Sequence, residues 1–179
     1  MSVESETLPR LFKALTFAAE RHEQQHRRGA VASPYINHPI DVADILCREA
    51  AVTDLDVLCA ALLHDTVEDT DATAEQLRSA FGEKVAAIVL ELTDDESLPR
   101  AQRERQQEEH AACLSEPARL VKLADKISNL RHTARTPPPE WDLQRRREYF
   151  DWGKRVIDRL RGVNPRLEAL FDQAYAARP

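Results

Sequence analysis

The sequence predicts an all-α protein built as a single helical bundle. Apolar residues recur at helical spacing along most of the chain, and the expected first helix, residues 8–25, shows this spacing at Leu11, Leu15 and Ala18, which would share one face. The sequence contains only four glycines, so signals for tight hairpin turns are few. Its 179 residues suffice for one domain with a sizeable core.

A second helix is expected to begin near His38, because Pro39 would then occupy the first turn, where a missing N–H group costs little. A third helix is expected over residues 55–64, with Asp54 as an acceptable N-cap whose side chain can bind free backbone N–H groups. This third segment is apolar almost throughout, so we expect it to be buried.

The rest of the chain continues the same pattern. We expect helices over residues 73–81, 84–92, 99–114, 117–132, 143–161 and 165–176. Either Asp71 or Thr73 is suited to cap the first of these helices. Three consecutive prolines at positions 137–139 predict a rigid loop, because proline runs favour an extended backbone.

The composition limits the class of protein and its partners. A net charge of −6 argues against a general nucleic-acid binder, which usually carries a basic face. No segment approaches the roughly 18 uninterrupted apolar residues of a membrane span, and no signal sequence is evident. The cysteines, Cys47, Cys59 and Cys113, predict buried free thiols because they are odd in number and widely spaced. We expect a cytoplasmic protein with neither a nucleic-acid nor a membrane partner.

A candidate metal site stands out because His64 and Asp65 interrupt a strongly apolar segment. A second imidazole is available from His38, and a second carboxylate from Asp125. Asp125 could instead pair with a lysine, but a buried carboxylate is costly unless it is paired or bound to a cation. This mixed nitrogen and oxygen set suits a divalent ion that activates water, and it lacks the thiolates typical of structural zinc.

Two further carboxylates, Glu68 and Asp69, follow the His-Asp pair. If the helix continues past His64, each lies one turn beyond a candidate ligand, beside the ion. A carboxylate in that position can orient a water molecule and take its proton. The alternative is a solvated turn, since acidic stretches after a helix commonly cap the next one.

The order of these residues resembles the HD phosphohydrolase superfamily, whose signature is a separated His, a His-Asp doublet and a distant Asp. The flanking segments, residues 35–39, 62–70, 120–126 and 148–152, are similar to the hydrolase half of the RelA/SpoT alarmone enzymes. They most closely resemble the small free-standing hydrolases that include the animal SpoT homologue. The resemblance extends from about residue 17 to residue 171 and implies a single HD domain over residues 1–179.

The resemblance implies hydrolysis of guanosine 3′-diphosphate 5′-diphosphate, or its pentaphosphate form, to pyrophosphate and GDP or GTP. It implies a bound manganese ion held by His38, His64, Asp65 and Asp125, with Glu68 and Asp69 as the catalytic acids. One ion is expected, because the chain lacks an obvious additional pair of histidines after the doublet.

An anionic substrate also needs cationic partners, which the chain offers at residues 26–28, at Lys122 and Lys126, and at residues 145–147. Most such runs are simply solvated faces. The resemblance implies that Arg27 or Arg28 contacts the nucleotide and that Arg100, Asn129 and Tyr149 contact substrate or line its pocket. The chain departs from the family at Glu96, where close relatives often have lysine, and this departure weakens the expected phosphate contact there.

Two other functions remain open. Removal of the 2′-phosphate of NADPH, or hydrolysis of another nucleotide, would use the same fold and metal. A non-catalytic alarmone-binding protein is the alternative from another class, but the presence of all six metal and acid positions argues against it. The sequence leaves a homo-oligomer open.

Overall fold

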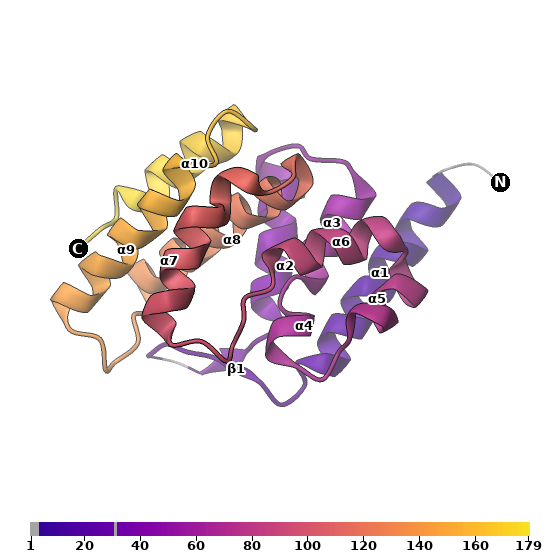
Figure 1. Cartoon of the computed structure of the whole chain (residues 1–179), viewed down its shortest axis with the longest axis horizontal. Helices are drawn as coiled ribbons and strands as arrows, with labels where there is room; N and C mark the ends of the chain where they lie inside the picture. Colours follow the sequence, from indigo (N-terminus) through magenta and orange to yellow (C-terminus); the bar gives the residue numbers. More distant parts are fainter. Residues whose placement is uncertain (1–3, 31) are drawn as a thin grey trace.

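A computed structural model describes residues 4–30 and 32–179 and shows a bundle of helices joined by short loops (Figure 1). The helices are α1 (Glu4–Arg21), α2 (Asn37–Asp44), α3 (Leu55–Leu63), α4 (Thr66–Asp69), α5 (Ala74–Phe81), α6 (Glu83–Leu92), α7 (Arg100–His110), α8 (Glu116–Arg135), α9 (Leu143–Asp158) and α10 (Pro165–Tyr175). A π-helix, η1 (Ile45–Glu49), extends α2, and a 3₁₀ turn, η2 (Ala111–Cys113), follows α7. The predicted all-α class is therefore confirmed.

The main departure from the predicted elements is a small hairpin of two strands, β1 (His26–Arg27) and β2 (Ser33–Pro34), paired antiparallel. Strands of two residues are too short to leave an alternating pattern, so the sequence did not predict them. The first helix also lies about four residues earlier in the chain than expected. It ends at Arg21, and this frees the following residues, up to the hairpin, to form a turn near the cavity described below.

Helix α3 forms the centre of the bundle. Every residue from Val57 to Leu63 is buried, and the helix packs against α1, α2, α6 and α8. The predicted cap is confirmed, because the side chain of Asp54 accepts hydrogen bonds from the backbone N–H groups of Asp56 and Val57. The cap fixes the start of this central helix, and His64 directly follows its other end.

The turn between α4 and α5 is closed by Thr73 rather than Asp71. The Thr73 side chain accepts a bond from the backbone N–H of Gln76, whose own side chain accepts from the N–H of Thr73. This reciprocal pair satisfies two backbone donors that a helix start otherwise leaves free. Gly82 then connects α5 to α6 with a φ of +91°, a conformation that glycine adopts at little cost.

The long helix α8 joins the two ends of the molecule. It contacts α2, α3 and α6 on one side and α9 and α10 on the other, and Figure 1 shows it in the middle of the bundle. The middle of α8 is buried and includes the polar residues Lys122, Asp125 and Lys126. Buried charges of this kind need partners, and their partners come from α2, α3 and the segments that follow them.

The cysteines are free, as predicted, but only Cys59 is buried, whereas Cys47 and Cys113 are exposed. The prediction of buried thiols was therefore wrong for those two, which lie on the outer faces of η1 and η2. Within the described residues, no helix combines the length and apolar character needed to cross a membrane.

Candidate active site

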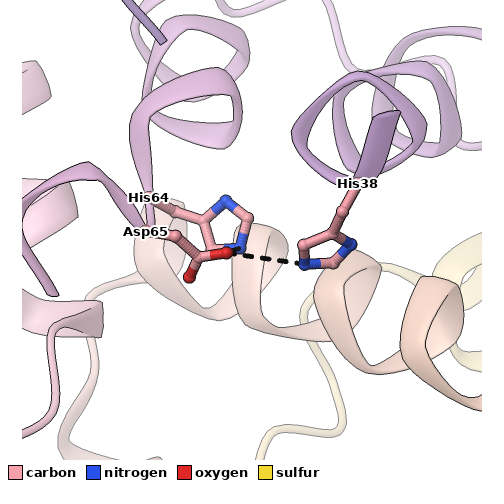
Figure 2. A group of neighbouring side chains, drawn as sticks. All are labelled: His38, His64 and Asp65. Atoms are coloured by element: carbon pink, nitrogen blue, oxygen red, sulfur yellow. Dashed lines mark ion pairs between the residues drawn. The ribbon is translucent and has the colours of Figure 1, made fainter. Parts of the chain in front are cut away.

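Side chains from the first turn of α2 and from the end of α3 converge at the centre of the candidate site (Figure 2), and Asp125 of α8 joins them. Nε2 of His38 lies 3.2 Å from Oδ1 of Asp125 and 3.6 Å from Oδ2 of Asp65. Nε2 of His64 lies 3.1 Å from the same Asp65 oxygen and 3.9 Å from Oδ1 of Asp125. The structure thus brings together all four residues that the sequence predicted as metal ligands.

The local fold explains this convergence. His38 lies in the first turn of α2, and His64 is the C-cap of α3. Asp65 follows in the turn before α4, so the helix does not continue unbroken past His64. One helical bond nevertheless crosses the break, from the N–H of Asp69 to the carbonyl of Asp65 (2.8 Å), which preserves the one-turn spacing between these two acids.

Both imidazole rings are oriented by their second nitrogen. Nδ1 of His64 lies 2.8 Å from the carbonyl oxygen of Ala61. A carbonyl only accepts, so Nδ1 donates the proton, and in the neutral ring the lone pair of Nε2 faces the centre of the site. Nδ1 of His38 lies 3.1 Å from the hydroxyl oxygen of Ser128. Partners of this kind fix the tautomer and direction of metal-binding histidines.

The two candidate carboxylate ligands are also held in place. The Tyr35 hydroxyl donates to Oδ2 of Asp65 (2.6 Å). Nδ2 of Asn129 donates to Oδ1 of Asp125 (2.5 Å), while Nζ of Lys126 lies 3.3 Å from its Oδ2. These bonds leave each carboxylate aimed at the imidazoles. The sequence placed Tyr35 within a family motif without indicating this role.

The residues at the centre fit a divalent cation. Ligand atoms of His38, His64 and Asp65 lie within 4.8 Å of one another, and Nε2 of His64 is buried without a hydrogen bond to any described residue. Burial by itself lowers the pKa of His64, but the Asp65 carboxylate outweighs it and raises that pKa to about 9. Burial likewise opposes ionisation of Asp65, yet His64 holds the pKa of Asp65 below its usual range. The centre therefore attracts positive charge.

Glu68 and Asp69 lie beside this centre. Their carboxylate oxygens and that of Glu96 lie within 4.8 Å of one another, so Glu96 adds negative charge beside them. Oε2 of Glu68 accepts a bond from the backbone N–H of Asp94 (2.8 Å). Burial raises the pKa of Glu68 to about 7 and that of Asp69 to about 6, with Asp65 adding to the shift for Asp69.

Gln25 connects the loops that carry these acids, a role that the sequence did not reveal. Its Nε2 donates to the backbone carbonyl of Asp69 (2.6 Å), and its own backbone carbonyl accepts from the N–H of Tyr35 (2.9 Å). Because its amide nitrogen donates to Asp69, its Oε1 is the atom that accepts from Nδ1 of His22 (2.7 Å). His22 is buried, so it anchors Gln25 from inside the fold.

A cavity of about 600 Å³ opens over the centre. Its lining includes the four candidate ligands, Glu68 and Asp69, and every residue predicted to contact substrate: Arg27, Arg28, Arg100, Asn129 and Tyr149. The volume lies within the range typical of small-molecule sites. The residues that the sequence grouped by motif are therefore grouped in space as well.

The hairpin holds two of the predicted substrate residues at the rim. Arg27 donates from Nη2 to Oδ1 of Asn129 (2.8 Å), and the carbonyl of Arg28 lies 2.9 Å from Nε2 of His132. A Cβ atom at Gly29 would lie 3.0 Å from the same His132 nitrogen, so glycine permits the hairpin to approach α8 closely. Arg27 is thereby linked through Asn129 to the candidate ligand Asp125.

Part of the cavity lining is aromatic. Tyr149 lies between Trp141 and Trp152, with ring centroids 5.0 and 5.6 Å away. The guanidinium group of Arg100 lies 5.4 Å from the centre of the Trp141 ring and also pairs with Glu104 at 2.8 Å. Trp141 and Trp152 were not predicted as site residues. Flat rings beside cations provide a surface on which a nucleotide base can stack.

Comparison with known proteins identifies the family. A family model described as HD domain matches residues 14–151, which is most of the chain. The chain belongs to the HD-domain family. HD-domain hydrolases depend on a metal ion, and the described residues include a His and Asp group able to hold one.

Individual HD-domain relatives match nearly the full length. The chain is 52% identical over 168 residues to guanosine-3′,5′-bis(diphosphate) 3′-pyrophosphohydrolase MESH1 of Danio rerio, covering 94% of this chain and 93% of that protein. It is 48% identical over 168 residues to the Homo sapiens protein of the same name, covering 94% of each. The resemblance to the small alarmone hydrolases is confirmed.

A solved structure of an HD-domain relative has the same fold. It is described as a metazoan ortholog of SpoT that hydrolyzes ppGpp and plays a role in starvation responses. It matches with a TM-score of 0.91 and 47% sequence identity, covering 94% of this chain and 95% of that chain.

Proposed function

We propose that this protein is a metal-dependent pyrophosphohydrolase that removes the 3′-diphosphate from guanosine 3′-diphosphate 5′-diphosphate and from the corresponding pentaphosphate. The observation that carries the proposal is the convergence of His38, His64, Asp65 and Asp125 beside Glu68 and Asp69 in one cavity. The names of the relatives, which act on this class of nucleotide, support the choice of substrate.

We further propose that His38, His64, Asp65 and Asp125 hold one manganese ion within a single HD domain that spans the chain. Imidazole nitrogen and carboxylate oxygen are ligands that suit manganese, and the inward-facing Nε2 atoms provide the nitrogen donors. When bound, the ion supplies positive charge that polarises a phosphoryl oxygen and lowers the pKa of water.

The chemistry of the chain's own residues then follows from their positions. Glu68 and Asp69 orient the attacking water and accept its proton. Burial raises the pKa of Glu68 to about 7, and a base whose pKa lies near the working pH is effective in proton transfer. Gln25 holds the backbone of Asp69 through its 2.6 Å hydrogen bond, and this keeps the Asp69 carboxylate in position beside the metal ligands.

The proposed reaction replaces one phosphorus–oxygen bond by another. Water attacks the phosphorus atom bonded to the 3′ oxygen, and the bond between this phosphorus and the 3′ oxygen breaks. The 3′ oxygen leaves with a proton as the hydroxyl group of GDP or GTP, and the oxygen of the water departs in pyrophosphate. Arg27, Arg28 and Arg100 offset the charge of the phosphates, because guanidinium groups form paired bonds with phosphate oxygens.

The test is a substrate panel with purified, manganese-loaded protein. Guanosine tetraphosphate, NADPH and a cyclic dinucleotide are incubated separately, and the products are separated by chromatography. The proposal predicts GDP and pyrophosphate from the tetraphosphate as the fastest reaction. Faster release of phosphate from NADPH would make the 2′-phosphatase the correct function, and binding of the tetraphosphate without turnover would favour a non-catalytic protein.

A further inference from the structure

Lys122 is a buried lysine on α8 and one of the residues that line the active-site cavity. The residue is 9% exposed. Among the described residues, its one hydrogen bond is a long one of 3.5 Å, from Nζ to the carbonyl oxygen of Leu92. Within residues 4–30 and 32–179, no carboxylate oxygen lies within 4.0 Å of this ammonium group.

Lys126, one turn further along α8, also lines the cavity, but its ammonium group has charged and aromatic partners. Its Nζ lies 3.3 Å from Oδ2 of Asp125 and 4.4 Å from the centre of the Trp152 ring. The attraction of Asp125 raises the pKa of Lys126 despite burial, whereas burial and the charge of Lys126 lower the pKa of Lys122. The two lysines share a cavity, and only one has an internal ionic partner.

The nearest acids are already engaged by other donors. Glu68 accepts from the backbone N–H of Asp94 (2.8 Å), and the side chain of Asp94 accepts from Gln107. Asp125 accepts from Asn129 (2.5 Å) and pairs with Lys126. An ammonium group has three donors and is costly to bury unless it is paired. Lys122 therefore has unused donors at the wall of the cavity.

We propose that Nζ of Lys122 binds a non-bridging phosphoryl oxygen of the substrate's 3′-diphosphate, between Glu68 and the ligand Asp125. The inference rests on the proposed function and assigns the contact to the residue that the acids leave unpaired. The ammonium group stabilises negative charge that builds up as pyrophosphate leaves, and a fixed charge in a cavity screened from water is effective in this role.

The alternative role for Lys122 is structural. Leu92 is the last residue of α6, and its carbonyl belongs to the helix end, where a lysine can cap the free oxygen. A cap requires only a hydrogen-bond donor, whereas a phosphate contact requires the positive charge. The two roles therefore differ in what a neutral donor can replace.

The experiment compares Lys122→Gln, which keeps an N–H donor and removes the charge, with Lys122→Met, which removes both. Lys154→Gln is the matched control, because Lys154 is on α9, pairs with Asp158 and does not line the cavity. Three quantities are measured for each manganese-loaded protein: the dissociation constant of pyrophosphate at fixed free manganese, the melting temperature, and kcat/KM for guanosine tetraphosphate.

We expect both Lys122 variants to bind pyrophosphate at least about tenfold more weakly and to lose at least about tenfold in kcat/KM, with the metal content and melting temperature of Lys122→Gln retained. Lys154→Gln should match wild type in all three. Wild-type pyrophosphate binding in Lys122→Gln would overturn the inference, as would variants that lose stability or fail to fold while pyrophosphate binding per folded molecule is unchanged. If wild-type protein binds pyrophosphate through Lys122 but does not hydrolyse the tetraphosphate, the proposed function fails and the anion site stands.

Discussion

The hydroxyl group of Tyr35 donates a 2.6 Å hydrogen bond to Oδ2 of Asp65, the same oxygen that faces both imidazoles. Tyr35 follows β2, so this bond ties the hairpin region to the ligand cluster. The position of the shared oxygen thus depends on a residue outside the predicted ligand set.

Tyr35→Phe is expected to weaken manganese binding by about tenfold, which is the lower end of the effect seen when a residue supporting a metal ligand is lost. The ring remains to pack against His22, so the melting temperature of the metal-free protein should change little. Metal titration measures the effect. Tyr175→Phe is the control, because it removes a hydroxyl bonded to Asp151, away from the cavity. Equal metal affinity in the two variants would show that Tyr35 does not support the metal ligand Asp65.

His64→Ala and Asp125→Ala are each expected to remove most of the bound manganese and most of the turnover. Each change deletes a candidate ligand, while the apolar core around α3 and α8 remains intact. Circular dichroism should therefore show a folded protein. Metal analysis of the purified variants checks the prediction, and full metal occupancy with an unchanged rate in both would contradict the proposed site.

Glu68→Gln is expected to lower turnover by at least about tenfold while metal content stays close to wild type, because it removes a base and keeps the size of the side chain. Single-turnover rates and metal content are measured on the same preparation. Asp69→Asn serves as the companion variant. Normal turnover in both variants would show that Glu68 and Asp69 belong to a solvated turn and take no part in catalysis.

Glu68 should also make stability depend on pH in the metal-free protein. Its pKa is raised by burial from 4.5 to about 7, so between these values the folded state binds more protons than the unfolded state. Stability falls as pH rises through this window. Glu68→Gln should therefore gain about 2 kcal/mol relative to wild type between pH 5 and pH 8. Urea unfolding at the two pH values tests this, and a relative stability that does not vary with pH would contradict it.

Gln25→Leu is expected to lower kcat by about tenfold, with smaller changes in KM and metal content, because it releases the backbone of Asp69 and leaves the ligands in place. Gln144→Leu is a suitable control, since Gln144 bonds Glu148 on the exposed face of α9. Steady-state kinetics separate the two parameters. A change confined to KM would instead assign Gln25 to substrate binding.

Replacing both Arg27 and Arg28 by alanine should reduce the preference for guanosine tetraphosphate over NADPH, because a 3′-diphosphate carries more charge to offset than a 2′-monophosphate. The ratio of kcat/KM for the two substrates measures this preference independently of errors in enzyme concentration. A ratio equal to that of wild type would show that Arg27 and Arg28 do not determine the preference between the two substrates.

The sequence predicted those parts of the site that depend on local pattern. His64 directly follows the apolar helix α3, and Asp125 lies in the middle of a helix with an evident core face, so both positions follow from local helix patterns. The same reasoning predicted the helices, apart from boundary shifts, and missed a hairpin with two-residue strands. Local patterns carry this much information because helix periodicity and capping are short-range.

The supporting contacts were not predictable, because their partners are distant in the chain. Gln25 meets Asp69 across 44 positions, and Lys122 meets Leu92 across 30. No spacing rule indicates that Lys126 takes the available carboxylate while Lys122 is left without one. The exposure of Cys47 and Cys113 likewise depends on which side of each helix the rest of the bundle covers.

The most direct test of the central claim is the fate of oxygen when manganese-loaded protein acts on guanosine tetraphosphate in ¹⁸O-labelled water. The proposed function predicts one labelled oxygen in pyrophosphate, none in GDP, and loss of this product when manganese is removed or Glu68 is changed to glutamine. Label in the 3′-hydroxyl group of GDP, or no cleavage of the tetraphosphate by the loaded protein, would contradict it.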